Sequence, residues 1–114
     1  MKYALLIYPG TTLEAFEQLP AEKQQSIRGE YLALTREPGM LGAEQLQPPE
    51  SATTVRVEDG KTLTTDGPFA DTKEFLGGIY LLEADDLDGA LDLAARIPAA
   101  RMGGAVEVRP LVER

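Results

Sequence analysis

Apolar and polar positions along the first third of the chain predict one strand followed by two helices. The unbroken apolar run from Tyr3 to Tyr8 is typical of a strand that is covered on both faces. After the Pro9-Gly10 turn, Thr11 stands three residues before Glu14 in the spacing of a capping box, which predicts a short helix.

A longer helix is expected over residues 20–37, because Ile27, Tyr31 and Leu34 fall on one helical face. The segment Met40–Ser51 contains glycine and two prolines and shows little periodicity. It therefore predicts a connecting loop within one domain.

The second half of the chain predicts a hairpin and then a strand, a helix and a strand. Thr54–Glu58 and Lys61–Thr65 alternate with period two around Asp59-Gly60, a dipeptide that favours a two-residue hairpin turn. Further strands are expected over Gly77–Glu83 and Val106–Arg109. Between them a helix is expected with one apolar stripe, which consists of Leu87, Ala90, Leu91, Ala94 and Ile97.

Interleaved strands and helices with antiparallel pairings indicate an α+β sandwich of the ferredoxin-like class. The 114 residues are enough for one domain, residues 1–114. The helices can cover only one face of the sheet, whereas the run Tyr3–Tyr8 needs cover on both. We therefore expect a homodimer that packs sheet to sheet.

Composition excludes several classes of function. The chain has no cysteine and no histidine, so disulfides, Cys/His metal sites, thiol nucleophiles and imidazole bases are excluded. A net charge of −8 would repel phosphate backbones, so nucleic acid is not an expected partner. No membrane-spanning or export segment is visible, and we expect a cytoplasmic protein without a cofactor.

The segment Asp66–Glu74 carries the candidate chemistry, and two interpretations of it stay open. In one, Asp66 starts a tight turn, Phe69 fills the core, and Asp71 or Thr72 caps a single helical turn. In the other, four charged residues converge on a cleft and bind a ligand. These candidates are Asp66, Asp71, Lys73 and Glu74. The spacing of the three carboxylates matches no calcium loop, and we expect no metal.

The nine residues of this segment, DGPFADTKE, resemble the signature DGPFAETKE of the DGPF-domain proteins, a branch of the YCII-related superfamily. Asp71 stands where glutamate is commoner. Further matches extend over nearly the whole chain, at residues 1–8, 46–49, 53–56, 77–80 and 106–111. The resemblance implies a ferredoxin-like fold that dimerises through its sheets, as in the dimeric α+β barrels.

The resemblance also implies a link to a sigma-factor pathway, because members are often encoded beside extracytoplasmic-function sigma factors. The wider superfamily has been suspected of enzymatic activity through a His–Asp pair in a cleft. This chain has no histidine, so that pair cannot be transferred to it.

Three functions therefore remain open: a dimeric ligand-binding or regulatory accessory protein, a histidine-free enzyme that uses Asp66, Lys73 or Glu74, and a purely structural dimer. Carboxylates around Lys73 favour its protonated form, so Lys73 would offer a positive charge and hydrogen-bond donors rather than act as a general base. Glu74 is then the expected proton acceptor. We expect ligand binding rather than turnover.

Overall fold

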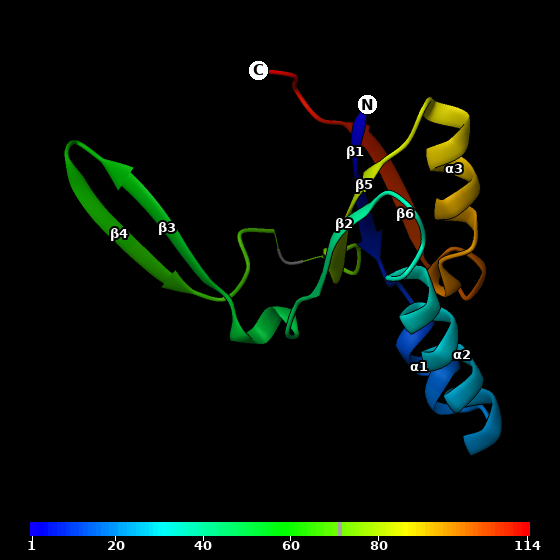
Figure 1. The fold of residues 1–114 in the computed structure, drawn as a ribbon. Coiled ribbons are helices and arrows are strands. Elements are labelled where there is room, and N and C mark those ends of the chain that lie inside the picture. The colour runs from blue at the N-terminus through cyan, green and yellow to red at the C-terminus, as the bar shows by residue number, and fades with distance from the viewer. Residues whose placement is uncertain (71) are drawn as a thin grey trace.

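The central sheet has four antiparallel strands, as the computed structural model of residues 1–70 and 72–114 shows (Figure 1). In spatial order they are β2 (Met40–Gln45), β5 (Gly78–Glu83), β1 (Lys2–Tyr8) and β6 (Ala105–Pro110). Strands β1 and β2 both run antiparallel to β5. Two helices connect β1 to β2 along the chain. The predicted α+β class is confirmed, and the order is consistent with a ferredoxin-like fold.

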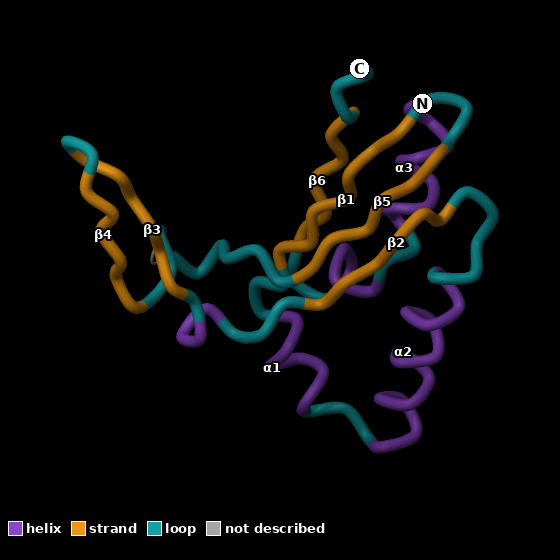
Figure 2. The backbone as a smooth tube through the Cα atoms, turned by 60° about the vertical axis from the view of Figure 1, so that its left-hand side comes forward, coloured by secondary structure: helices purple, strands orange, loops and turns teal. Residues whose placement is uncertain are grey.

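Helices cover one face of this sheet, as Figures 1 and 2 show from two directions. They are α1 (Thr12–Glu17), α2 (Ala21–Leu34) and α3 (Leu87–Ala95), and a short 3-10 turn, Pro98–Arg101, follows α3. A second 3-10 turn, Pro49–Ser51, lies on the other side of the sheet, between β2 and the next strand along the chain (Figure 1). Thr11 precedes α1 as expected, but its side chain makes no capping hydrogen bond. Within residues 1–70 and 72–114, no helix is long and apolar enough to cross a membrane.

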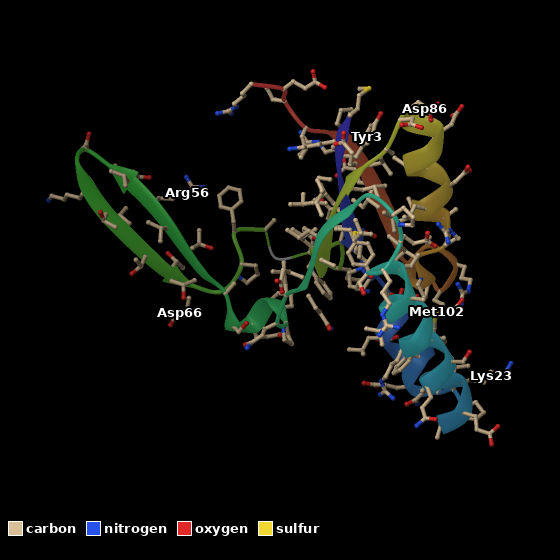
Figure 3. The ribbon with its side chains drawn as sticks, in the orientation of Figure 1. Tyr3, Lys23, Arg56, Asp66, Asp86 and Met102 are labelled. Atoms are coloured by element: carbon tan, nitrogen blue, oxygen red, sulfur yellow. The ribbon has the colours of Figure 1, made fainter. Side chains whose placement is uncertain are left out.

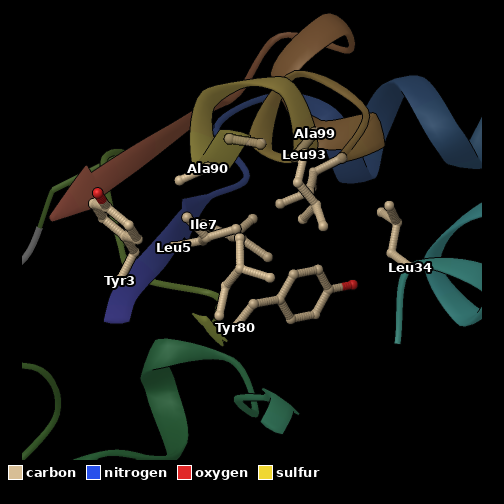
Figure 4. Close-up of a cluster of buried hydrophobic side chains, with 11 residues drawn as sticks. Tyr3, Leu5, Ile7, Leu34, Tyr80, Ala90, Leu93 and Ala99 are labelled. Atoms are coloured by element: carbon tan, nitrogen blue, oxygen red, sulfur yellow. The ribbon is translucent and has the colours of Figure 1, made fainter. Parts of the chain in front are cut away.

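The hydrophobic core lies between the sheet and the helices (Figure 4). Alternate residues of β1 point into it, because successive side chains of a strand face opposite sides. Tyr3, Leu5 and Ile7 are buried there, and their neighbours on β5 are Leu82, Tyr80 and Gly78. The core also contains Leu34 of α2 and a set from the α3 region: Ala90, Leu93, Ala94, Ile97 and Ala99.

The opposite face of the sheet has an apolar centre that no helix covers. Ala4, Leu6 and Tyr8 of β1 lie beside Leu81 and Ile79 of β5, and all five are partly exposed. Charged residues surround them: Lys2, Glu44, Glu83, Glu107 and Arg109. We call these residues the open face. The uncovered apolar centre agrees with the need for cover inferred from the run Tyr3–Tyr8, and the sheet-to-sheet homodimer stays a prediction.

The prediction of a loop throughout Met40–Ser51 is wrong over its first half. Residues Met40–Gln45 form the edge strand β2, with a register shift between Met40 and Gly42. Met40 and Ala43 pack against the core. The strand exists because β5 supplies its hydrogen-bond partners, and no local periodicity in this glycine-containing segment could indicate that pairing.

The apolar stripe predicted for the last helix is rotated about the helix axis relative to the face of α3 that is buried. Leu87 and Leu91 are exposed, whereas Leu93 is buried together with Ala90 and Ala94. At 100° per residue, the two exposed leucines lie about 70–110° away from the centre of the buried face. Small alanines let α3 approach the sheet closely, so the larger leucines stay at its margin.

Burial raises the pKa of the hydroxyls of Tyr31 and Tyr80 above the ordinary value of 10.0. For Tyr80 the neighbouring Tyr31 adds to the effect, and for Tyr31 the Ala99 backbone and Arg101 partly offset it. Above about pH 10 the unfolded chain loses these protons while the folded chain keeps them, so the stability they contribute is lost.

We therefore expect the free energy of unfolding to fall as the pH rises above about 10, and to fall less steeply in Tyr80→Phe. Urea unfolding of both proteins across this pH range measures the two slopes. Equal slopes would show that the Tyr80 phenol does not contribute to the pH dependence of the free energy of unfolding.

Candidate functional site

The predicted hairpin is confirmed and leads into the motif segment. Strands β3 (Thr53–Glu58) and β4 (Lys61–Asp66) pair with each other through a tight turn. Asp59 and Gly60 have φ angles of 50° and 75°, the left-handed values that such a two-residue turn requires. The hairpin lies on the side of the sheet away from the helices (Figures 1 and 2).

Backbone hydrogen bonds fix the start of the motif to the loop after β2. Gly67 has a φ of 102°, a conformation that favours glycine. Its N–H donates to the carbonyl of Ala52 at 2.7 Å, and its own carbonyl accepts the Thr54 hydroxyl at 2.8 Å. The chain therefore turns sharply after Asp66 and folds back beside residues 46–52.

The two segments border an open hollow of about 450 Å³, which we call the motif pocket. Its walls are mainly apolar, and this suits the body of a small organic ligand. Lining residues from the first segment and β3 are Leu46, Gln47, Pro48, Pro49, Ser51, Ala52 and Thr54. Those from the motif and the residues after it are Pro68, Phe69, Ala70, Glu74, Phe75 and Leu76.

Of the four candidate site residues, the structure places Glu74 in the wall of this pocket. Asp66 ends β4 opposite Thr53, is exposed, and lies at the foot of the hairpin (Figure 3). Lys73 is exposed and does not line the pocket. Asp71 lies outside the described residues. Neither a hydrogen bond nor an ion pair joins Asp66, Lys73 and Glu74 in the part of the chain that the structure describes.

The purely structural interpretation of the motif is partly wrong. Phe69 does not fill the core, because its side chain is 73% exposed, and the guanidinium of Arg56 lies 4.8 Å from its ring centroid. Thr72 does accept a hydrogen bond from the N–H of Glu74 at 3.1 Å, but the segment 72–74 forms bends and no helical turn. The segment is held by the Gly67 contacts and not by a buried aromatic anchor.

The polar groups of the pocket differ in what they can offer a ligand. The Ser51 hydroxyl donates to the carbonyl of Pro48 at 2.8 Å, and that of Thr54 donates to Gly67. These two protons are therefore engaged within the protein. Glu74 makes no ion pair within residues 1–70 and 72–114 and is exposed. Its carboxylate is the charged acceptor that the pocket presents.

Sequence reasoning missed the apolar residues that build the walls. Leu46, Pro48 and Pro49 belong to the segment interpreted as a plain connection, and Phe75 and Leu76 follow the motif. A signal was available, since each segment places large apolar residues in an otherwise polar loop. Which loop faces which depends on the pairing of β2 with β5, and that pairing was not predicted.

A second hollow lies on the helical side of the molecule, between α2 and the turn Pro98–Arg101. It measures about 440 Å³ and is lined by charged residues that include Glu30 and Arg101. These two side chains form an ion pair at 2.5 Å. One of its two cations, Arg101, and one of its two anions, Glu30, are therefore already matched, and Lys23 and Glu22 add one further charge of each sign, so this hollow favours neither sign of ligand charge. Among the described residues, no group of acidic side chains could hold a metal ion.

Comparison with known proteins places the chain in a family. It is 38% identical over 116 residues to an uncharacterised protein of Rhizobium meliloti (strain 1021). The aligned region covers 97% of this chain and 92% of that protein. A family model, the YCII-related domain, matches residues 1–114. With the α+β fold and the motif segment in place, the match over the full length shows that the chain belongs to the YCII-related domain family.

Proposed function

We propose that this protein is a small dimeric accessory protein that binds a small molecule in the motif pocket. The observation that carries the proposal is the position of the motif, which folds over an apolar hollow of about 450 Å³ and directs Glu74 into its wall. A pocket with apolar walls and few polar groups is the usual form of a small-molecule site.

The chemistry of the walls favours a ligand with an apolar body and one positively charged amine. Among residues 1–70 and 72–114, Glu74 is the only charged residue that lines the pocket, and a carboxylate binds an ammonium group through charge-assisted hydrogen bonds. The guanidinium of Arg56 lies 4.8 Å from the ring centroid of Phe69, so one face of this lining ring is already occupied by a cation and Glu74 remains the group that would bind the amine. A ligand carboxylate would instead be repelled by Glu74.

Dimerisation through the open face supplies the second part of the proposal. Ala4, Leu6, Tyr8, Ile79 and Leu81 form a partly exposed apolar centre that a second copy would cover. Membership of the DGPF branch, a cytoplasmic location and a link to a sigma-factor pathway stay predictions from the resemblance.

A histidine-free enzyme is the alternative, and the geometry supports it less well. General acid–base chemistry needs a proton donor and acceptor positioned around one substrate atom. Glu74 lines the pocket but Lys73 does not, and among the described residues no ion pair joins their side chains. Binding needs only the one carboxylate and the apolar walls.

We expect phenethylamine to bind more tightly than phenylacetate, a probe of similar shape with the opposite charge. Glu74→Gln should weaken amine binding by about three- to tenfold, because a partly exposed charged hydrogen bond is lost. Calorimetric titration of both probes measures the two affinities. The matched control is Glu50→Gln, which removes an equal charge from an exposed residue beside the pocket that does not line it.

Equal affinity for the two probes, or equal weakening by both substitutions, would overturn the assignment of Glu74. Turnover of an amine that is lost in Glu74→Gln would favour the enzyme instead.

A further inference from the structure

The β3–β4 hairpin lacks the support that a strand pair normally needs. The two strands pair only with each other, and every residue in them except Thr54 is exposed. A two-stranded hairpin alone in water is marginally stable at best. Val55, Val57 and Leu63 nevertheless expose large apolar side chains on it. A partner surface would stabilise this element and cover part of its apolar area.

The overall shape confirms that the hairpin stands away from the body. The radius of gyration is 16.2 Å, whereas a compact chain of this length has about 13 Å. The molecule measures 49 × 41 × 18 Å. In Figures 1 and 2 the hairpin extends on the side of the sheet opposite the helices, which is the side of the open face.

Alternation along the strands divides the hairpin into two faces. Arg56 pairs across the strands with Leu63, and the Arg56 side chain lies on the side directed toward the sheet (Figure 3). We call this the inner face: Thr54, Arg56, Glu58, Lys61, Leu63 and Thr65. The outer face contains Thr53, Val55, Val57, Thr62, Thr64 and Asp66. The inner face and Phe69, which contacts Arg56, therefore look toward the space in front of the open face.

We propose that the hairpin is a dimerisation arm whose inner face packs on a second copy of this chain. The proposal rests on the sheet-to-sheet dimer of the proposed function. A second copy that covers the open face must enter the side on which the hairpin stands. In a two-fold dimer each arm would then contact the other subunit in the same way.

Charge and apolar character both match this occupant. The inner face offers Leu63 opposite Arg56 and beside Lys61, and Glu58 lies opposite Lys61, so Arg56 is the cation of this face with no anion across from it. The rim of the open face offers acidic groups, among them Glu44 beside Ile79 and Glu107 beside Leu6. Opposite charges at the edge of an apolar contact fix the orientation of two surfaces and disfavour incorrect pairings.

The first test compares substitutions on the two faces of the hairpin. We expect Leu63→Asp to raise the dissociation constant of the dimer at least tenfold, because a carboxylate would enter an apolar and acidic contact. Val57→Asp, on the more exposed outer face, should leave it within about threefold. Sedimentation equilibrium gives all three constants. If the wild type is a dimer and both substitutions leave its dissociation constant unchanged, the hairpin is not a dimerisation arm. If the wild type is a monomer, the sheet-to-sheet dimer itself is wrong.

The second test locates the arm without relying on dimer strength. Because the chain has no cysteine, Leu63→Cys can carry a single benzophenone label. The labelled protein is mixed with ¹⁵N-enriched wild type and irradiated, and cross-linked peptides are analysed by mass spectrometry. We expect arm peptides joined to ¹⁵N-enriched peptides of the sheet strands. Cross-links found only within one chain would contradict the proposal.

Discussion

Replacing Leu5 by alanine is expected to lower the free energy of unfolding by about 2–5 kcal/mol, because it leaves a cavity in the centre of the core. Leu5 is 0% exposed, and its strand neighbours are Tyr80 and Val108. Leu5 belongs to a buried cluster with Tyr80, Leu93 and Ile97, and packed surroundings of this kind relax only partly into a cavity. Urea unfolding followed by circular dichroism measures the loss.

Leu32→Ala is the matched control for that loss. Leu32 lies in α2, and its side chain is 55% exposed, so truncation removes few contacts. We expect a change within about 0.5 kcal/mol. Equal losses from the two substitutions would contradict the position of the core between the sheet and the helices.

Replacing Leu6 by lysine is expected to abolish the dimer while leaving the chain folded. Leu6 lies next to Leu5 but points to the open face, between Ile79 and Glu107 of the neighbouring strands. Two-fold symmetry would bring two ammonium groups into one apolar contact, where neither is well hydrated. We expect the dissociation constant to rise about a hundredfold or more.

Sedimentation equilibrium should then give the mass of one 12.3 kDa chain for Leu6→Lys and twice that mass for the wild type. Leu13→Lys makes the same change at a leucine of α1 that is 61% exposed on the helical side, and it should remain dimeric. Circular dichroism shows whether each variant is folded. A folded Leu6→Lys variant that stays dimeric would exclude the open face as the interface.

Local chemistry was enough to predict the elements whose signals lie within a few residues. Asp59-Gly60 specifies the hairpin turn because both positions need left-handed backbone, and the apolar run Tyr3–Tyr8 predicts the strand β1. Asp86 caps α3 by accepting the N–H of Gly89 at 2.9 Å, as expected for an acidic residue at a helix start.

Elements that depend on distant partners could not be predicted in the same way. Strand β2 forms because β5 lies beside it, and Leu93 rather than Leu87 is buried because the sheet fixes the rotation of α3. The motif pocket arises from two loops that are about twenty residues apart in sequence, and Glu74 acquires its position there only when the sheet brings them together. Sequence pattern alone placed Asp66 and Lys73 among the site candidates together with Glu74, although neither lines the pocket.

Binding of a cationic small molecule in the motif pocket can be followed residue by residue in an NMR titration. Phenethylamine is added to ¹⁵N-enriched wild type, and amide shifts are followed along the chain. We predict saturable shifts concentrated in residues 46–54, 68–70 and 74–76, which contain the residues that line the pocket, and weaker binding in Glu74→Gln. Shifts spread over the acidic surface without saturation, or concentrated around Glu30 and Arg101 in the other hollow, would contradict it.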